Sequence, residues 1–338
     1  MFPVTTDEEF FKTLMNILDL SAKDNAYKFA FAKFLLEYCN SHNETETHVD
    51  FSTIAKYFLE YYWLQECKYK LRQAHQVSKK PEIIKIIQRE FPKSYYPQSF
   101  QKIMEIEPEK IQRCIEKIKK KCFHNVTWRF QKIKYGRTNK EIRIFFDYKY
   151  ARIIHKNKKF IDLDNGINLN PKAMSFFKRY NPALNKAVIL EWTRFSEILN
   201  KDVPKLIPKI EGKLTKRIDL GKFKKALKKQ KRCFYCNNKL SSAPRQTHVE
   251  HVIPFDFIAE DNIWNFVLAC QGCNLMKQGS LPPKKFLGDL IKRNKICGGK
   301  IDGLKESLEI LGAGWEKSIN DNYVNAKSHG YAVLRSIP

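Results

Sequence analysis

Two Cys-x-x-Cys pairs constrain the fold of this chain more than any other feature of its sequence. The first pair is Cys233 and Cys236, the second is Cys270 and Cys273, and 33 residues separate the two pairs. Four thiolates at this spacing are typical of a closed tetrahedral zinc site, which stabilises a small fold. A thioredoxin-like redox role would need one such pair beside a βαβ unit, and that context is missing. The sequence therefore predicts a structural zinc ion bound by these four cysteines.

The remaining cysteines and the apolar pattern bear on the compartment. The other five cysteines are isolated, and we expect them to be reduced. The first residues lack the basic region of a signal peptide, and no run of about 18 uncharged apolar residues occurs. We therefore expect a soluble cytoplasmic protein without membrane contact.

The charge of the chain is large and uneven. Lys and Arg number 62 against 36 Asp and Glu, which gives a net charge of +26. Residues 110–160 contain 17 basic and 3 acidic residues, and residues 201–232 contain 13 and 3, so these stretches hold 24 of the 26 net charges. Solvated helix faces would explain such charge without a partner. A polyanion explains it better, because each neutralised phosphate releases counterions, and we expect these stretches to form a polyanion-binding surface.

At 338 residues the chain is long enough for about two domains. Apolar residues recur at helical spacing through the first 135 residues, and the aromatic residues between 58 and 63 are expected to be core rather than a platform for stacking bases. The stretch 141–163 reads as two or three short strands, and Asn170-Pro171 as a helix start. The predicted fold class is α+β, mostly α. We expect a helical region for recognition or dimerisation (1–135), a mixed region with a basic DNA-binding connector (136–225), a cysteine-rich core (226–285) and a C-terminal helical tail (286–338).

A second pattern lies between and just after the cysteine pairs. The segment His248-Val-Glu250-His251-Val-Ile-Pro254 alternates like a strand, and Asn265 precedes a second strand at 266–269. Asn274, directly after Cys273, begins a short predicted helix. This order and spacing resemble the HNH (ββα-metal) endonuclease family, in the version whose core is held by a four-cysteine zinc site. The resemblance covers the region 233–283.

The resemblance implies a role for each matching residue. His251 corresponds to the general base that takes a proton from the attacking water, and histidine titrates near neutral pH, as this task needs. Glu250 and Asn274 correspond to ligands of the catalytic divalent ion, and Asn265 to the residue that holds the loop orienting the base. The family more often has His or Asp at the first metal position and His at the last. Because Glu and Asn offer oxygen ligands, we expect Mg²⁺ or Mn²⁺.

Three nearby residues have two interpretations each. His248 lies two positions before Glu250 and is either a third ligand or substrate contact, or an ordinary hydrogen-bonded residue. Lys277 reaches a phosphate or is simply solvated. Asn262 is the alternative to Asn265 in the loop-holding role, and the apolar residues after Asn265 favour Asn265.

The predicted function is hydrolysis of DNA phosphodiester bonds, in the setting of restriction or anti-phage defence that the resemblance implies. A homodimer would supply two active sites for two strands, and a nickase is the alternative. The main rival is a zinc-stabilised nucleic-acid-binding protein without catalysis, although a binding module needs neither Glu250 nor His251. RNA as substrate ranks lower, because no RRM or KH motif is present.

Overall fold

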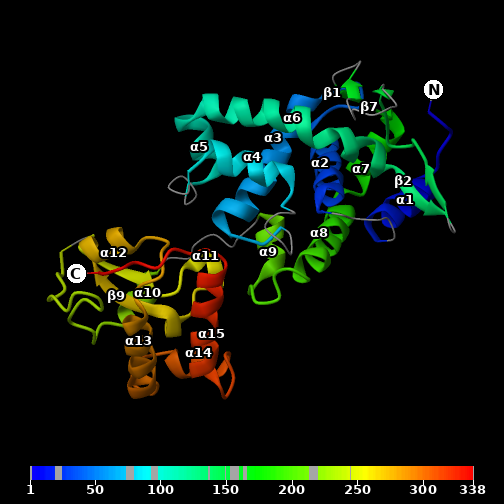
Figure 1. Cartoon of the computed structure of the whole chain (residues 1–338). Helices are drawn as coiled ribbons and strands as arrows, with labels where there is room; N and C mark the ends of the chain where they lie inside the picture. The colour runs from blue at the N-terminus through cyan, green and yellow to red at the C-terminus, as the bar shows by residue number, and fades with distance from the viewer. Residues whose placement is uncertain are drawn as a thin grey trace. The chain divides into compact units, whose positions relative to one another are not determined.

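The computed structural model of the chain describes residues 2–19, 25–73, 80–92, 98–135, 138–148, 150–152, 160–162, 166–212, 220–243 and 245–337. The chain forms two compact units, whose helices and strands are labelled in Figure 1. The first comprises Met1–Lys68, Arg72–Leu199 and Ile210–Gly212, and the second comprises Tyr69–Leu71, Asn200–Lys209 and Lys213–Pro338. Both units combine helices with small antiparallel sheets, which confirms the predicted fold class, α+β and mostly α.

Helices make up most of the first unit. They are α1 (Asp7–Asp19), α2 (Tyr27–Ser41), α3 (Phe51–Tyr62), the π-helix η1 (Trp63–Lys68), α4 (Glu82–Glu90), α5 (Phe100–Ile106), α6 (Pro108–Phe130), α7 (Pro171–Arg179) and α8 (Asn181–Glu197). Asn170 begins α7 as predicted: its side chain accepts a hydrogen bond from the backbone N–H of Lys172 at 3.0 Å, and Pro171 occupies the first helical position. None of the described helices has the length and apolar character needed to cross a membrane.

The core of the first unit is built from aromatic side chains on α2 and its neighbours. Phe31 of α2 has no exposed surface, and its ring centroid lies 5.0 Å from that of Phe130 and 5.3 Å from that of Phe146. The residues Phe58, Tyr62 and Trp63 are likewise fully buried. Buried aromatic pairs of this kind stabilise a core through area and ring geometry. The aromatic run at 58–63 is therefore core, as expected, and offers no stacking surface to bases.

Three small sheets accompany these helices. The strands β1 (His48–Asp50), β7 (Gly166–Leu169) and β4 (Phe146–Asp147) form one antiparallel sheet in that order; β2 (Lys132–Tyr135) pairs with β3 (Thr138–Glu141), and β5 (Tyr150–Arg152) with β6 (Phe160–Asp162). A Cβ atom at Gly166 would lie 2.3 Å from the carbonyl oxygen of Val49, so only glycine allows β7 to pair with β1 there. Strands occur in the predicted stretch 141–163, part of which lies outside the described residues.

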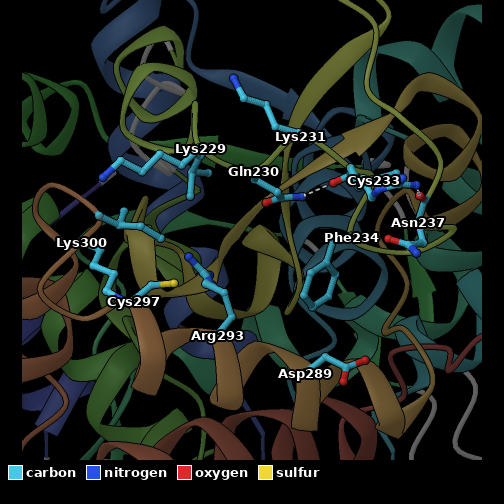
Figure 2. Close-up of a pocket in the computed structure, with 13 residues that line it drawn as sticks. Lys229, Gln230, Lys231, Cys233, Phe234, Asn237, Asp289, Arg293, Cys297 and Lys300 are labelled. Atoms are coloured by element: carbon cyan, nitrogen blue, oxygen red, sulfur yellow. Dashed lines mark hydrogen bonds between the residues drawn. The ribbon is translucent and has the colours of Figure 1, made fainter.

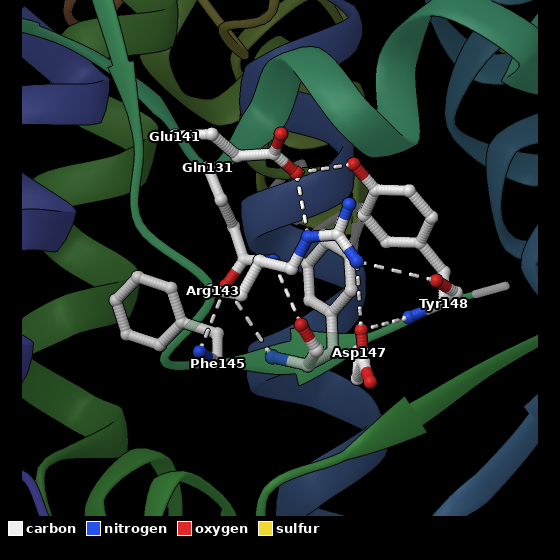
Figure 3. A network of polar contacts seen from close by, with 7 residues as sticks. Gln131, Glu141, Arg143, Phe145, Asp147 and Tyr148 are labelled. Atoms are coloured by element: carbon white, nitrogen blue, oxygen red, sulfur yellow. Dashed lines mark hydrogen bonds and ion pairs between the residues drawn. The ribbon is translucent and has the colours of Figure 1, made fainter. Parts of the chain in front are cut away.

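A buried glutamine closes the end of α6 onto the sheet. Gln131 has no exposed surface, and its Oε1 accepts a hydrogen bond from the backbone N–H of Phe145 at 2.9 Å while its Nε2 donates to the carbonyl of Phe146 at 2.8 Å (Figure 3). The side-chain amide thus pairs with the backbone much as a neighbouring strand would. Such pairing is required because buried backbone groups need partners.

Arg143 belongs to the basic stretch 110–160 but is engaged within the fold (Figure 3). Its Nε donates to Glu141 at 2.7 Å, its Nη1 donates to Asp147 at 3.0 Å, and its guanidinium lies 4.3 Å from the ring centre of Tyr148. The two carboxylates offset its charge locally. This arginine therefore contributes less to a polyanion-binding surface than the sequence count suggests.

The second basic stretch, 201–232, divides into buried and exposed lysines. Lys209 has no exposed surface, and its Nζ donates to the carbonyl oxygens of Pro204, at 2.7 Å, and Phe257. Burial lowers the pKa of Lys209 to about 7. Its role is structural, because it holds the end of a helix close to the candidate site. Other lysines of the stretch lie on the surface, among them Lys222, Lys225 and Lys228.

The second unit contains a ββα core followed by three helices. Its elements are α10 (Gly221–Ala226), β8 (Thr247–His251), α11 (Phe255–Ile258), the 3₁₀-helix η4 (Ile263–Asn265), β9 (Phe266–Cys270), α12 (Gln271–Lys277), α13 (Lys284–Cys297), α14 (Leu304–Glu309) and α15 (Trp315–Ser328); α9 (Leu206–Glu211) spans the boundary between the units. β8 and β9 are antiparallel, with His251 opposite Phe266. α12 begins at Gln271, three residues before the predicted start, so Cys273, Asn274 and Lys277 share one helix.

The C-terminal helices pack onto this core. The side chain of Asn294 on α13 donates to the carbonyl of Trp264 at 3.0 Å, and the backbone N–H of Trp264 donates to Ser307 on α14 at 3.3 Å. Both contacts fix the short segment that leads into β9. The helices after the core therefore support β9, the strand that pairs with β8 and ends at Cys270.

Candidate active site

Four cysteine thiols meet in the second unit. Cys233 and Cys236 lie on a turn before β8, Cys270 ends β9 and Cys273 lies on α12. Their Sγ atoms all lie within 4.8 Å of one another, and those of Cys236 and Cys270 are 3.8 Å apart. Zn–S bonds of about 2.3 Å in a tetrahedron place neighbouring sulfurs about 3.8 Å apart. The cluster therefore fits a structural zinc ion, and in the described parts of the chain no second group of three or more His, Cys, Asp or Glu ligands is found.

The backbone around Cys233 favours the thiolate that zinc binds. Burial raises the pKa of this thiol, but backbone N–H groups of Cys236, Cys270 and Tyr235 point toward the sulfur and bring its pKa below the ordinary value. The N–H of Cys270 lies 3.4 Å from the Cys233 sulfur. The turn is joined to β9 by a hydrogen bond from the N–H of Phe234 to the carbonyl of Leu268, at 3.0 Å. The metal site and the sheet therefore form one structural unit.

His251 ends β8 and is largely buried, with 8% of its surface exposed. Its ring lies between those of Phe255 and Phe266, at centroid distances of 5.3 and 4.4 Å. Its Nε2 lies 3.0 Å from Oδ1 of Asp261. Because a carboxylate only accepts hydrogen bonds, the proton of the neutral ring lies on Nε2, and Nδ1 keeps its lone pair in that tautomer. Nδ1 is the ring atom that can accept a proton from a substrate.

Asp261 is a residue that the sequence analysis missed. It lies in the loop between α11 and η4, beside Glu260 and Asn262, and its side chain is 11% exposed. Several polar residues occur together in this loop, and nothing in their spacing distinguishes the one that reaches His251. Glu260 pairs with Lys205 at 2.6 Å instead, and Asn262 donates to Glu260 at 2.9 Å.

Asn265 holds the backbone that follows His251. Its side chain is fully buried; Oδ1 accepts a hydrogen bond from the N–H of Ile253, and Nδ2 donates to the carbonyl of the same residue, both at 2.8 Å. Its own carbonyl accepts a hydrogen bond from the N–H of Val252 at 2.9 Å. These three bonds fix the turn directly after His251. A loop-holding residue at this position would need such contacts, whereas the side chain of the alternative, Asn262, is bound to Glu260.

Glu250 and Lys277 form a buried ion pair. Lys277 has no exposed surface, and its Nζ lies 2.8 Å from Oε1 of Glu250, whose side chain is 14% exposed. Burial lowers the pKa of Lys277, and the carboxylate of Glu250 opposes that effect. Lys277 is therefore neither solvated nor directed to an external phosphate, in contrast to both sequence interpretations. The reason is helical periodicity: Cys273 faces the sheet, and Lys277 follows it by one turn on the same face of α12.

Asn274 and His248 complete the set of predicted residues. Asn274 is half-buried on α12, which packs against β8 and β9, so it lies on the element next to Glu250. The Nε2 of His248 lies 2.7 Å from the carbonyl oxygen of Arg245 in the preceding turn. That contact is the hydrogen-bonded arrangement that was the simpler interpretation of His248.

Two family models match this chain, one mainly in the first compact unit and one in the second. A family model described as a domain of unknown function (DUF8808) matches residues 7–209, which is more than half of the chain. The chain belongs to the DUF8808 family. The model described as HNH endonuclease matches residues 233–279. No curated protein and no solved structure matches the chain.

The HNH match places a nuclease-type domain after the DUF8808 domain. It begins at the first zinc cysteine and includes β8, β9 and α12, together with every predicted site residue. The predicted family resemblance is therefore confirmed for this segment. The zinc cluster, the residues around His251 and the Glu250–Lys277 pair all belong to the HNH domain of this DUF8808 protein.

Loss of one zinc ligand should unfold this domain. We expect Cys236→Ser to abolish zinc binding and to expose the segment 233–279 to protease, because a structural zinc contributes on the order of 10 kcal/mol to the folding of a small domain. Zinc content by mass spectrometry and limited proteolysis measure the two effects. Cys297→Ser, outside the cluster, is the matched control and should keep its zinc. A Cys236→Ser protein with full zinc content and wild-type protection would contradict the assignment.

Proposed function

We propose that this protein is a DNA endonuclease that hydrolyses phosphodiester bonds with one divalent metal ion and with His251 as general base. The observation that carries the proposal is the hydrogen bond between Nε2 of His251 and Asp261. It leaves the lone pair of Nδ1 available at the end of β8, directly beside Glu250 and within the HNH match. A general base needs such a fixed tautomer before it can take a proton from water.

The donor chemistry of Glu250 and Asn274 suits Mg²⁺ or Mn²⁺. Both side chains offer hard oxygen atoms, which these ions prefer to nitrogen or sulfur. Lys277 occupies Oε1 of Glu250, so Oε2 is the oxygen of that carboxylate proposed to bind the ion. A bound ion would offset the negative charge that develops on the phosphate and on the leaving oxygen. Zinc, in contrast, is held by sulfur at a separate site.

Side chains of the protein transfer the proton and position the base. His251 accepts the proton of the attacking water at Nδ1, and Asp261 stabilises the imidazolium that results, as the third member of a catalytic triad does. Asp261 is thus a positioning residue. Asn265 keeps the turn after β8 rigid through its two bonds to Ile253, so that the imidazole keeps its direction.

Double-stranded DNA is the proposed substrate because of the surface charge next to the HNH match. Lys222, Lys225 and Lys228 are exposed on and just after α10, directly before the first zinc cysteine in the sequence. Phosphate contacts from such residues position a nucleic acid without specifying its sequence. The proposal of a homodimer rests on the need for two active sites to cut two strands. The proposal of a role in restriction or antiviral defence rests on the family resemblance.

One observation favours a second function, nucleic-acid binding without hydrolysis. The buried ammonium of Lys277 already neutralises Glu250, and a site that had lost its metal would look the same in this respect. The two functions differ in whether the bound DNA is hydrolysed. A binding module would bind DNA equally well with and without Mg²⁺ and would leave it intact.

Cleavage of supercoiled plasmid with Mg²⁺ or Mn²⁺ tests the proposed hydrolysis. We expect nicking or cutting by the zinc-loaded wild type and a loss of at least about 1,000-fold in rate for His251→Ala. Asp261→Asn should lower the rate by about 100-fold or more and change its pH profile, because the imidazole loses the carboxylate that fixes its tautomer. Glu260→Gln, in the adjacent position, is the matched control and should cut normally.

Two results would contradict the proposal. The first is cleavage by His251→Ala at the wild-type rate, which would place the base elsewhere. The second is tight DNA binding without any cleavage of plasmid, linear duplex or single strands in either metal, which would favour the binding module.

The salt dependence of DNA binding tests the role of the exposed lysines. Replacing Lys222, Lys225 and Lys228 together by glutamine should reduce the slope of log K against log salt concentration by about 2.7, because each phosphate contact contributes about 0.9. Fluorescence anisotropy of a labelled duplex measures the slope. The triple variant of Lys305, Lys317 and Lys327, which are equally exposed on the C-terminal helices, is the control. An unchanged slope in the first variant would exclude these three lysines from the DNA-binding surface.

A further inference from the structure

The second unit contains a pocket that the proposed cleavage reaction does not use. It encloses about 580 Å³ between α13 and the segment 227–237 (Figure 2). This volume is in the range of pockets that bind small molecules. None of its lining residues is Glu250, His251 or Asn274.

The hydrogen bonds of β9 show that the pocket lies along the edge of the sheet away from β8. The N–H of Val252 donates to the carbonyl of Asn265, so the backbone of Asn265 faces β8. The backbone N–H and C=O groups of successive residues alternate in direction along a strand, and those of Phe266 and Leu268 therefore point away from β8. Gln230 bonds both backbone groups of Leu268, at 2.7 and 3.0 Å. Nη2 of Arg293 donates to the carbonyl of Phe266 at 2.7 Å. The pocket residues Gln230 and Arg293 therefore occupy the strand edge opposite to the one that pairs with the catalytic strand.

Arg293 brings a buried charge into this pocket. Figure 2 shows its side chain directed from α13 toward the space between Gln230, Cys297 and Phe234. Its Nη2 is satisfied by backbone carbonyls, but Nε and Nη1 are buried and have no hydrogen-bond partner within the described parts of the chain. Burial lowers the pKa of Arg293 to about 10. A guanidinium stays charged at neutral pH, and a buried charge with unsatisfied N–H groups is costly unless an anion or water pairs with it.

The remaining lining residues indicate the charge of the missing partner. Lys229, Lys231, Arg232 and Lys300 contribute four further cations, and Asp289 is the single acidic residue in the lining. Within the described residues, no carboxylate pairs with Nε or Nη1 of Arg293, and the surrounding positive charge favours an anion with more than one negative charge.

The lining also has an apolar part. Phe234 is half-buried, and Leu227 and Ile301 add aliphatic surface beside it. An aromatic ring next to a cationic group suits a ligand that combines a flat base with a phosphate, because bases stack on aromatic side chains and phosphates pair with Arg and Lys. An inorganic anion would contact the cationic residues of this pocket but not its apolar residues.

We propose that this pocket is a binding site for the phosphate and base of a nucleotide, distinct from the site of hydrolysis. The phosphate would satisfy Nε and Nη1 of Arg293 and would be held by Lys229 and Lys300 at the pocket mouth. Its source is either a free mononucleotide or a nucleotide of a bound nucleic acid, since both present the same chemistry. The proposal concerns binding and does not depend on whether the protein cuts DNA.

Isothermal titration calorimetry of the zinc-loaded full chain, without Mg²⁺, tests this site with AMP, adenosine and inorganic phosphate as probes. We expect AMP to bind with a Kd at or below about 1 mM, and more tightly than inorganic phosphate or adenosine alone. Lys300→Glu should weaken AMP binding by at least about tenfold, as loss of one charge-assisted contact predicts. Lys292→Glu, an exposed lysine of α13 outside the pocket lining, is the matched control and should bind AMP as the wild type does.

Arg293→Gln is the stronger test, but Arg293 also holds the carbonyls of Trp264 and Phe266, and the variant can fail for structural reasons. Lys300→Glu together with Lys229→Glu keeps the proposal testable, because both side chains are exposed. Competition between AMP and a short duplex for the pocket would assign the phosphate to nucleic acid, and independent binding would assign it to a free nucleotide. Absence of AMP binding, or equal binding by the Lys300→Glu and Lys292→Glu variants, would overturn the proposal.

Discussion

The four-thiol cluster is the interaction on which the HNH domain depends. Its ligands come from the turn at 233–236, from the end of β9 and from the first turn of α12, so one zinc ion would join three elements of the domain. The direction of α12 follows from Cys273, and with it the positions of Asn274 and Lys277. The candidate catalytic metal site is therefore a consequence of the zinc site.

Next to the zinc site, two pairs of polar side chains define the candidate catalytic site. His251 and Asp261 form the pair proposed for proton transfer, and their hydrogen bond determines which nitrogen of the neutral ring carries the proton. Glu250 and Lys277 form the second pair, which places a buried cation where the metal ligand is proposed. Breaking a buried ion pair by removing one partner is costly. Glu250 thus has a structural as well as a proposed catalytic function. Variants of Glu250 or Lys277 would change both the stability of the domain and the proposed catalysis.

The sequence predicted the parts of the site that depend on local spacing. Each cysteine pair, the alternation in β8 and the asparagine before β9 are patterns of only a few consecutive residues, and the structure has the corresponding elements. Asp261 and the burial of Lys277 were not predictable in this way. The first depends on how a loop folds back onto His251, and the second on a helix that starts three residues earlier than its sequence suggests. The Arg293 pocket depends on packing between segments distant in sequence, for which no local pattern exists.

Anomalous diffraction from crystals of the zinc-loaded protein soaked in Mn²⁺ tests the central claim, which is that two different metals occupy separate sites of one small domain. The account predicts a zinc peak among the four sulfurs and a manganese peak at the oxygens of Glu250 and Asn274, with the second peak lost in Glu250→Gln and the first retained. A zinc peak alone, with no manganese peak at Glu250 and Asn274, would contradict the proposed catalytic centre. The HNH domain would then be a zinc-stabilised module that binds nucleic acid without cutting it.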